Sequence, residues 1–238
     1  MNILDIPVYY ISFNANPELE SMLTDVGFTD VHHFNAVDGR KMDVDDLLKK
    51  GVIGIRGYND LVYGRSQHTG LTSGGAVGCT LSHLGLWKLC VDLDIPYMCI
   101  IEDDFIPKKL SESDHHAIKK TLGKTNGVFM GTTVKKPSET LFGTHFYIVS
   151  KEACKKLIKK ALPLDIQTDS YIGHLNNIGD ITVEGYKMGS LKNHKSSIQT
   201  TCVKCILPNN RWFYIGFLIL LIFMFVLCIF LLYRLYTR

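Results

Sequence analysis

A short stretch near the middle of the chain constrains the fold most. Residues 95–105 read Ile-Pro-Tyr-Met-Cys-Ile-Ile-Glu-Asp-Asp-Phe, so an apolar run over 97–101 leads directly into three carboxylates. An uninterrupted apolar run of this length is typical of a strand that is covered on both faces, as in the middle of a parallel sheet. Because ligands of open α/β sheets bind outside the carboxyl ends of such strands, we expect Glu102, Asp103 and Asp104 to lie at the mouth of a cleft.

These three adjacent acids predict a cation site. Neighbouring carboxylates repel one another unless a cation holds them together. Hard oxygen ligands suit Mg²⁺ or Mn²⁺, which usually bind through one or two carboxylates plus the phosphates of a substrate. A solvated acidic turn after a core strand would have the same composition, and the stretch alone does not separate the two interpretations.

The rest of the N-terminal region alternates between strand patterns and helix patterns. Residues 7–13 are β-branched and aromatic, as strands are, and Asn16-Pro17 is a typical start for the helix that follows. Further helices are expected near 43–50, 76–91, 113–122, 150–161 and 168–176, and further strands near 30–34, 127–130, 146–149 and 181–183. The glycine-rich residues 51–75 predict an irregular lid or binding loop. The alternation predicts an α/β fold with a mixed, mostly parallel sheet.

The C-terminal part of the sequence differs in kind. Residues 212–233 carry no charge and, at about 1.5 Å per helical residue, would span roughly 33 Å, close to the thickness of a bilayer core. We therefore expect a single C-terminal transmembrane helix over 212–233, with a short tail over 234–238. After Glu184 all charges are basic, so residues 190–211 are expected to form a basic juxtamembrane stalk. Without a signal-peptide pattern at its start, the chain is predicted to be a tail-anchored, single-pass membrane protein with a cytosolic N-terminal domain.

Four short segments, in order, carry a resemblance to a known family. Residues 34–39 read Phe-Asn-Ala-Val-Asp-Gly, 75–83 read Gly-Ala-Val-Gly-Cys-Thr-Leu-Ser-His, 100–104 read Ile-Ile-Glu-Asp-Asp, and 147–153 read Tyr-Ile-Val-Ser-Lys-Glu-Ala, followed by Leu-Asp-Ile-Gln-Thr-Asp over 164–169. In this order and at this spacing they resemble glycosyltransferase family 25, which includes bacterial lipooligosaccharide galactosyltransferases and animal collagen galactosyltransferases. The segments extend over most of residues 7–200.

The resemblance implies both a fold and an activity. The fold would be a GT-A-like nucleotide-sugar-binding domain over residues 1–189, with a UDP-sugar as donor and Mn²⁺ or Mg²⁺ as cofactor. The activity would be the inverting transfer of a hexose, galactose or glucose, to a hydroxyl of a glycan, lipid or protein acceptor. No nucleic-acid partner is expected. A cation held by Asp104 and by Glu102 or Asp103 would neutralise the charge that develops on the leaving diphosphate.

The candidate site residues follow from the family's motifs. Glu102 and Asp104 are the expected metal ligands. An inverting displacement also needs one general base, for which Asp169 is the first candidate and Asp165 the second, although either could be an ordinary acid at a helix N-terminus. The expected residues around the donor are Thr72, Gly75, Ser82, His83 and Asp103.

Two departures from the family's pattern keep an alternative open. Family members carry arginines just after the first strand, whereas residues 13–20 contain no cation, and Ala76 stands where the family's second motif has Glu. The alternative is a catalytically degenerate GT-A domain that acts as a membrane-bound binding or scaffold protein.

Overall fold

The computed structural model describes residues 2–65, 67–132, 143–192 and 224 of the 238-residue chain. The strands are β1 (Val8–Ser12), β2 (Val31–Asn35), β3 (Tyr97–Glu102), β4 (Phe105–Ile106), β5 (Gly127–Thr132), β6 (Phe146–Ser150), β7 (Thr182–Lys187) and β8 (Ser190–Leu191). The α-helices are α1 (Pro17–Asp25), α2 (Val44–Lys49), α3 (Ile55–Tyr63), α4 (Gly74–Asp92), α5 (Glu112–Leu122), α6 (Lys151–Lys160) and α7 (Thr168–Asn177), and two 3₁₀ turns are η1 (Ile3–Asp5) and η2 (Gly39–Lys41). All of these elements lie within the compact unit Met1–Cys202.

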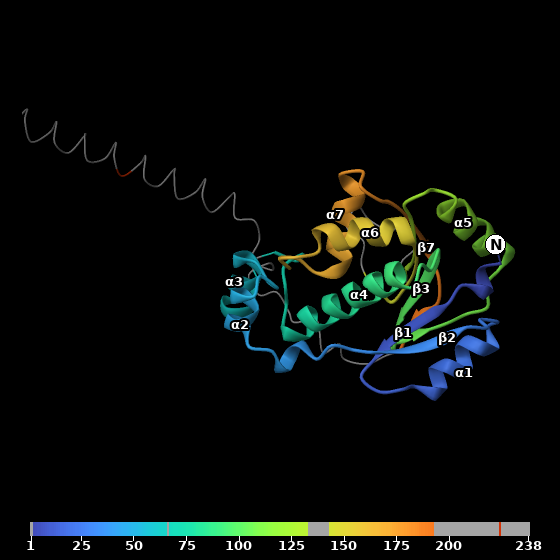
Figure 1. Ribbon diagram of the computed structural model, residues 1–238, viewed down its shortest axis with the longest axis horizontal. Coiled ribbons are helices and arrows are strands. Elements are labelled where there is room, and N and C mark those ends of the chain that lie inside the picture. Colours follow the sequence, from blue (N-terminus) through green and yellow to red (C-terminus); the bar gives the residue numbers. More distant parts are fainter. Residues whose placement is uncertain (1, 66, 133–142, 193–223, 225–238) are drawn as a thin grey trace, which may run out of the picture. The chain divides into compact units, whose positions relative to one another are not determined.

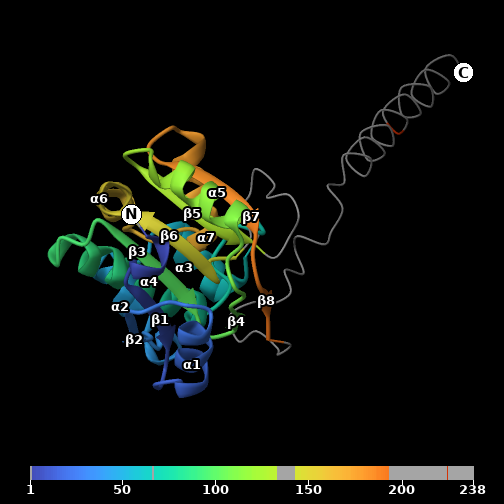
Figure 2. The same cartoon turned by 90° about the vertical axis from the view of Figure 1, so that its right-hand side faces the viewer.

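Six strands form one mixed sheet in the order β2-β1-β3-β6-β5-β7. β1 is parallel to β2 and β3, and β5 is parallel to β7, whereas β6 is antiparallel to both of its neighbours. Helices α4, α6 and α7 pack on one face, and α1 and α5 pack on the other (Figure 1). A separate two-stranded sheet joins β4 to β8 (Figure 2), so regular pairing continues two residues into the range predicted as a stalk. The expected α/β architecture with a mostly parallel sheet matches this arrangement.

The apolar run of β3 lies at the centre of the sheet and is covered on both faces. Met98 and Ile100 contact the core beneath α4 and α6, while Cys99 and Ile101 contact the core beneath α1 and α5. All four side chains are fully buried. This two-sided burial explains why the strand contains no alternating polar residues and why its first polar side chain, Glu102, marks the point where the strand leaves the core.

The glycine-rich region contains a helix that the sequence analysis did not predict. α3 occupies part of residues 51–75, where an irregular loop was expected. Glycine serves packing here, because a Cβ on Gly57 would lie 2.4 Å from the carbonyl oxygen of Leu164. The prediction was wrong for α3 because a glycine that is required by close packing has the same sequence signal as one that breaks a helix.

Helix α4 begins in close contact with the loop that follows β2. The Ser82 hydroxyl donates to the carbonyl of Gly78 (2.8 Å) and accepts from the backbone N–H of Val37 (2.9 Å). A Cβ on Gly78 would lie 2.2 Å from the carbonyl oxygen of Val37 and 2.6 Å from the nitrogen of Gly39. Glycine at this position therefore lets the loop and the helix pack backbone against backbone.

Replacing Gly78 by alanine is expected to destabilise the fold by about 1–3 kcal/mol, because the new methyl group must push a backbone segment out of place. Urea unfolding, followed by circular dichroism, measures the loss. Gly123→Ala is the control, since the nearest neighbour of its Cβ would be the Lys119 carbonyl oxygen at 3.3 Å and its φ is helical. Equal unfolding midpoints for the two variants would contradict this account of the contact.

The C-terminal transmembrane helix is a correction to the predicted fold class. Among the residues that the structure describes, no helix combines the length and the apolarity needed to cross a bilayer. The expected tail-anchored, single-pass membrane localisation is corrected with it. That expectation depended only on the composition of residues 212–233, which lie outside the described residues except for Met224.

Candidate functional site

The acids that follow β3 lie at the carboxyl end of the central strand. Glu102 is the last residue of β3 and is in register with Ile11 of β1, and Asp104 follows in the turn before β4. Their side chains are only 16% and 21% exposed. They are therefore held in the structure, unlike the freely solvated acids of an ordinary surface turn.

A large cavity of about 320 Å³ opens beside these acids. Its walls include residues 11–13 at the end of β1, residues 36–40 after β2, and the first turns of α4. Cys79 and Glu102 also line it. Pockets that hold small organic ligands have volumes of roughly 300–1,000 Å³, so the large cavity is of a suitable size.

A small cavity of about 80 Å³ adjoins the large one, because Cys79 and Glu102 line both. Its other walls are Asp104 and the segments 143–145 and 167–169. Glu102 thus lines both cavities, so groups bound in either one could lie beside it.

Glu102, Asp104 and His145 form a cluster whose ligand atoms lie within 4.8 Å of one another. The His145 Nδ1 is 3.0 Å from an Asp104 oxygen and 3.4 Å from the Glu102 Oε2. The Thr144 hydroxyl donates to Glu102 Oε1. In this arrangement the imidazole ring of His145 contacts both carboxylates.

The charges in this cluster stabilise one another. Burial alone would raise the pKa of Glu102, but hydrogen bonds from His145 and His83 hold it well below its ordinary value. Burial alone would lower the pKa of His145, but its hydrogen bonds to Asp104 and Glu102 raise it to about 10. These contacts therefore favour the protonated form of His145 and the ionised form of Glu102.

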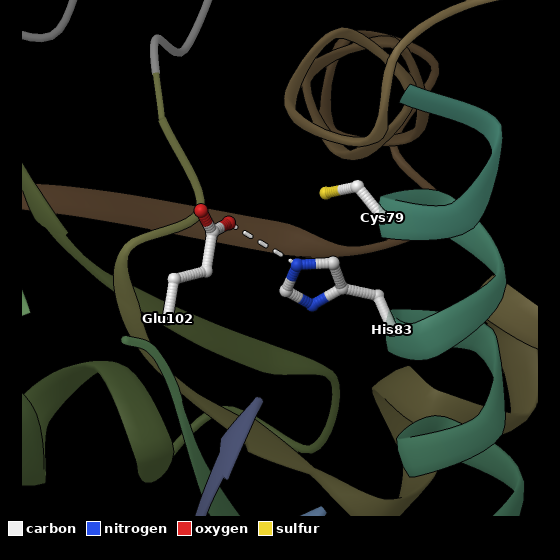
Figure 3. A group of neighbouring side chains, drawn as sticks. All are labelled: Cys79, His83 and Glu102. Carbon is white, nitrogen blue, oxygen red and sulfur yellow. Dashed lines mark hydrogen bonds and ion pairs between the residues drawn. The ribbon is translucent and has the colours of Figure 1, made fainter. Parts of the chain in front are cut away.

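A second cluster shares Glu102 with the first. Figure 3 shows Cys79 and His83 projecting from the same helix, α4, with the His83 ring directed at Glu102. His83 is fully buried, and its Nε2 lies 3.2 Å from Glu102 Oε1. Burial and the nearby charge of Glu102 raise the pKa of the Cys79 thiol well above its ordinary value.

Asp169 lies in the small cavity, in the first turn of α7. Its carboxylate accepts hydrogen bonds from the backbone N–H groups of Gly143 (3.2 Å) and Ser170 (2.7 Å). Burial raises its pKa, and the charge of Glu102 acts in the same direction, although the two backbone donors oppose them. A carboxylate with a raised pKa in a cleft is a better proton acceptor than an ordinary surface acid.

Asp165 lies elsewhere, outside the linings of both cavities. Its carboxylate accepts a hydrogen bond from the backbone N–H of Gly57 (2.8 Å), in the first turn of α3. The N-cap residue of that helix, Gly54, has no side chain to do this, so Asp165 caps the helix from a distant part of the chain. The structure therefore separates the two acids that the sequence left as alternatives.

Replacing Asp165 by alanine should lower the free energy of unfolding by about 1–2 kcal/mol, because it removes the cap of α3. The affinity for nucleotide and metal should change little, since the side chain does not reach either cavity. Chemical denaturation and ligand titration on the same samples measure the two quantities. A loss of ligand affinity without a loss of stability would contradict the capping role.

The residues predicted to surround the donor fall into two groups. Gly75, Ser82, His83 and Asp103 line the large cavity. Thr72 precedes α4 and is not among the lining residues of either cavity. Ser82 and His83 are fully buried and take part in internal hydrogen bonds, so their main contact is with the protein itself.

Sequence reasoning missed Thr144 and His145. They directly precede β6, which pairs antiparallel with β3 so that Phe146 is opposite Ile101. The backbone N–H of Glu102 donates to the His145 carbonyl (3.0 Å), which holds these residues beside the acids. The sequence does show a histidine just before a predicted strand. Whether that histidine lies near the acids depends on the order of the strands in the sheet, which the sequence alone does not reveal.

Arg40 and Phe13 were also missed, and both line the large cavity. The Arg40 guanidinium lies 4.9 Å from the centre of the Phe13 ring and donates to Asp38 through Nε (2.7 Å). Phe13 is 49% exposed. Among the described residues that line the large cavity, Arg40 is the one lysine or arginine. The cation-free residues 13–20, where the family carries arginines, supply none.

Comparison with known proteins points to one family. The model of "Glycosyltransferase family 25 (LPS biosynthesis protein)" matches residues 20–129. A glycosyltransferase 25 family member of Drosophila pseudoobscura pseudoobscura is 32% identical over 101 residues, which is 41% of this chain and 15% of the relative. Procollagen galactosyltransferase 1 of Danio rerio is 26% identical over 155 residues, 55% of this chain and 25% of the relative. A Bos taurus protein named probable inactive glycosyltransferase 25 family member 3 is 34% identical over 100 residues, 41% of this chain and 16% of the relative.

The matched region is a small part of each relative. The chain covers between 15% and 25% of the length of these three proteins. The similarity therefore concerns only a part of each relative.

Proposed function

We propose that this chain, which carries a glycosyltransferase family 25 domain, transfers a hexose from a UDP-sugar to an acceptor hydroxyl with inversion and with the help of a divalent cation. The observation that carries the proposal is the convergence of Glu102, Asp104 and Asp169 on one small cavity that shares Cys79 and Glu102 with a larger one. A donor and an acceptor can then meet beside both a cation site and a base.

The large cavity is the proposed site of the nucleotide. The exposed ring of Phe13 offers a flat surface for a nucleobase, and Arg40 offers a positive charge for a phosphate. The diphosphate would then lie toward Glu102, which lines both cavities. Galactose is favoured as the hexose, with glucose as the other choice, because two relatives are named procollagen galactosyltransferases. Those names also make a collagen-like protein the first acceptor to test.

Glu102, Asp104 and His145 fit a divalent cation. Two carboxylates supply the hard oxygen ligands that Mn²⁺ and Mg²⁺ require, and the imidazole nitrogen favours Mn²⁺ of the two. The contacts of His145 Nδ1 with a carboxylate oxygen of Asp104 and of Glu102 bring the three candidate ligands together, which supports this choice of site. When bound there, the cation would offset the negative charge of the leaving diphosphate.

Asp169 is the proposed general base. The acceptor oxygen attacks the anomeric carbon of the sugar, the bond from that carbon to the diphosphate oxygen breaks, and the hydroxyl proton passes to the Asp169 carboxylate. A single displacement of this kind inverts the anomeric centre. The backbone donors of Gly143 and Ser170 hold the carboxylate in place while it accepts the proton.

A second candidate function is a catalytically degenerate domain that binds nucleotide without transferring sugar. The cation-free stretch over 13–20 favours it, and so does the printed name of the Bos taurus relative, which describes that protein as probably inactive. Against it, the two acids of the cation site and the candidate base all remain and face the same cavity.

Release of UDP by the full chain tests the proposal. The chain is incubated with UDP-galactose, UDP-glucose and UDP-N-acetylglucosamine, with Mn²⁺ or with EDTA, in the presence and absence of a collagen peptide. We expect Mn²⁺-dependent release that is fastest with one hexose donor and is stimulated by acceptor. UDP binding without release from any donor would support the degenerate domain, and the absence of both would overturn each proposal.

A further inference from the structure

A chain of buried hydrogen bonds leads from the core to Glu102. The indole Nε1 of Trp87 lies 2.9 Å from the Tyr147 hydroxyl, and that hydroxyl lies 2.9 Å from His83 Nδ1. His83 Nε2 then lies 3.2 Å from Glu102 Oε1. Trp87, Tyr147 and His83 are fully buried, so water does not take part in these contacts.

The direction of each hydrogen bond follows from the donors available. An indole N–H can only donate, so the oxygen of Tyr147 accepts from Trp87. The Tyr147 hydroxyl has one proton, and the contact left for it is His83 Nδ1, to which it donates. A neutral imidazole that accepts at Nδ1 carries its proton on Nε2, which therefore donates to the Glu102 carboxylate.

The opposite tautomer would leave two buried groups in conflict. If His83 carried its proton on Nδ1, the Tyr147 hydroxyl would accept twice and its own proton would have no acceptor in the described contacts. The lone pair of Nε2 would also face the Glu102 carboxylate oxygen. Buried polar groups are rarely left in such a state.

We propose that Trp87, Tyr147 and His83 are positioning residues that orient the Glu102 carboxylate, and that His83 is not a cation ligand. The proposal rests on the function proposed above for Glu102. His83 and Thr144 both donate to Oε1, which leaves Oε2 in contact with His145. The cation therefore binds in the cluster of Glu102, Asp104 and His145. The cluster in Figure 3 contributes His83, which holds the Glu102 carboxylate in place.

Replacing Tyr147 by phenylalanine tests the chain of hydrogen bonds in the full-length protein. The variant removes the donor to His83 Nδ1, so we expect Mn²⁺ affinity, measured by electron paramagnetic resonance, to fall by about 10- to 100-fold. Tyr171→Phe is the matched control, because the Tyr171 hydroxyl is also buried, bonds the Leu157 carbonyl (2.6 Å) and packs against Trp87 without joining the chain. Equal Mn²⁺ affinities for the two variants would overturn the proposal.

The tautomer of His83 gives a readout that does not depend on metal. Long-range ¹H–¹⁵N spectra of the metal-free wild type are expected to show the proton on Nε2, and Tyr147→Phe is expected to disturb that signal. A proton on Nδ1 in the wild type would overturn the proposal even if Mn²⁺ binds. If the wild type binds no Mn²⁺ but has the proton on Nε2, the function proposed for Glu102 fails while the hydrogen-bond chain stands.

A second pair of variants covers the case in which Tyr147→Phe does not fold. His83→Gln keeps an N–H donor within reach of Glu102, whereas His83→Leu keeps only the volume. We expect Mn²⁺ affinity to be higher for His83→Gln than for His83→Leu by about tenfold or more. Equal affinities for this pair would overturn the positioning role.

Discussion

Replacing Asp169 by asparagine is expected to lower the rate of hexose transfer by about 10²- to 10⁴-fold. The amide cannot accept the proton of the acceptor hydroxyl, whereas its oxygen can still accept a hydrogen bond from Gly143 or Ser170. The loss should therefore appear in kcat, with the affinities for UDP and Mn²⁺ close to those of the wild type. Initial rates of UDP release at saturating donor, together with calorimetric titration of UDP, measure both quantities.

Asp165→Asn is the matched control for this prediction. It makes the same chemical change four residues earlier, at a side chain that caps α3 and lines neither cavity. We expect its kcat to stay within a few-fold of the wild type. If Asp165→Asn lost as much activity as Asp169→Asn, or if Asp169→Asn kept full activity, Asp169 would not be the base.

Replacing Asp104 by alanine is the second change with a large expected effect. It removes one of the two carboxylates of the cation cluster and the nearer partner of His145. Removal of supporting residues alone typically weakens metal binding 10- to 100-fold, so loss of a direct ligand should weaken it by at least about 100-fold. Mn²⁺ titration followed by electron paramagnetic resonance measures the affinity, and UDP binding should lose its dependence on Mn²⁺ at the same time.

The neighbouring acid offers a contrast. Asp103 lines the large cavity but does not belong to the cluster of Glu102, Asp104 and His145. Asp103→Asn is therefore expected to weaken Mn²⁺ binding by less than about tenfold. If Asp103→Asn and Asp104→Ala lost Mn²⁺ affinity equally, the acids would attract the cation through their summed charge alone. The cluster of Glu102, Asp104 and His145 would then not be the binding site.

Much of the domain could be predicted because its local signals agree with its packing. The uninterrupted apolar run of β3 indicated a strand covered on both faces, and the structure buries it on both. Asn16 caps α1 and Ser150 caps α6, as their positions before apolar helical patterns suggested. The family resemblance, predicted from four motifs, is confirmed by the family model over residues 20–129 and by the relatives.

The parts that could not be predicted depend on contacts between distant segments. α3 has no side-chain cap of its own and receives one from Asp165, which no local pattern of residues 51–75 reveals. For the same reason Asp165 and Asp169 were indistinguishable in sequence, although one caps a helix and the other faces a cavity. His145 reaches the acids only because β6 lies antiparallel beside β3. The transmembrane helix predicted over 212–233 depended on composition alone. It is corrected because no helix among the described residues has the length and apolarity needed to cross a bilayer.

The central claim is that Glu102 and Asp104 hold a cation that in turn holds the diphosphate of a UDP-sugar. Anomalous X-ray scattering from Mn²⁺, in crystals of the chain grown with UDP and Mn²⁺, tests it most directly. The account predicts one anomalous peak within bonding distance of carboxylate oxygens of Glu102 and Asp104 and of a UDP phosphate. A peak between Cys79 and His83, or UDP bound in the large cavity with no Mn²⁺ at the two acids, would contradict it.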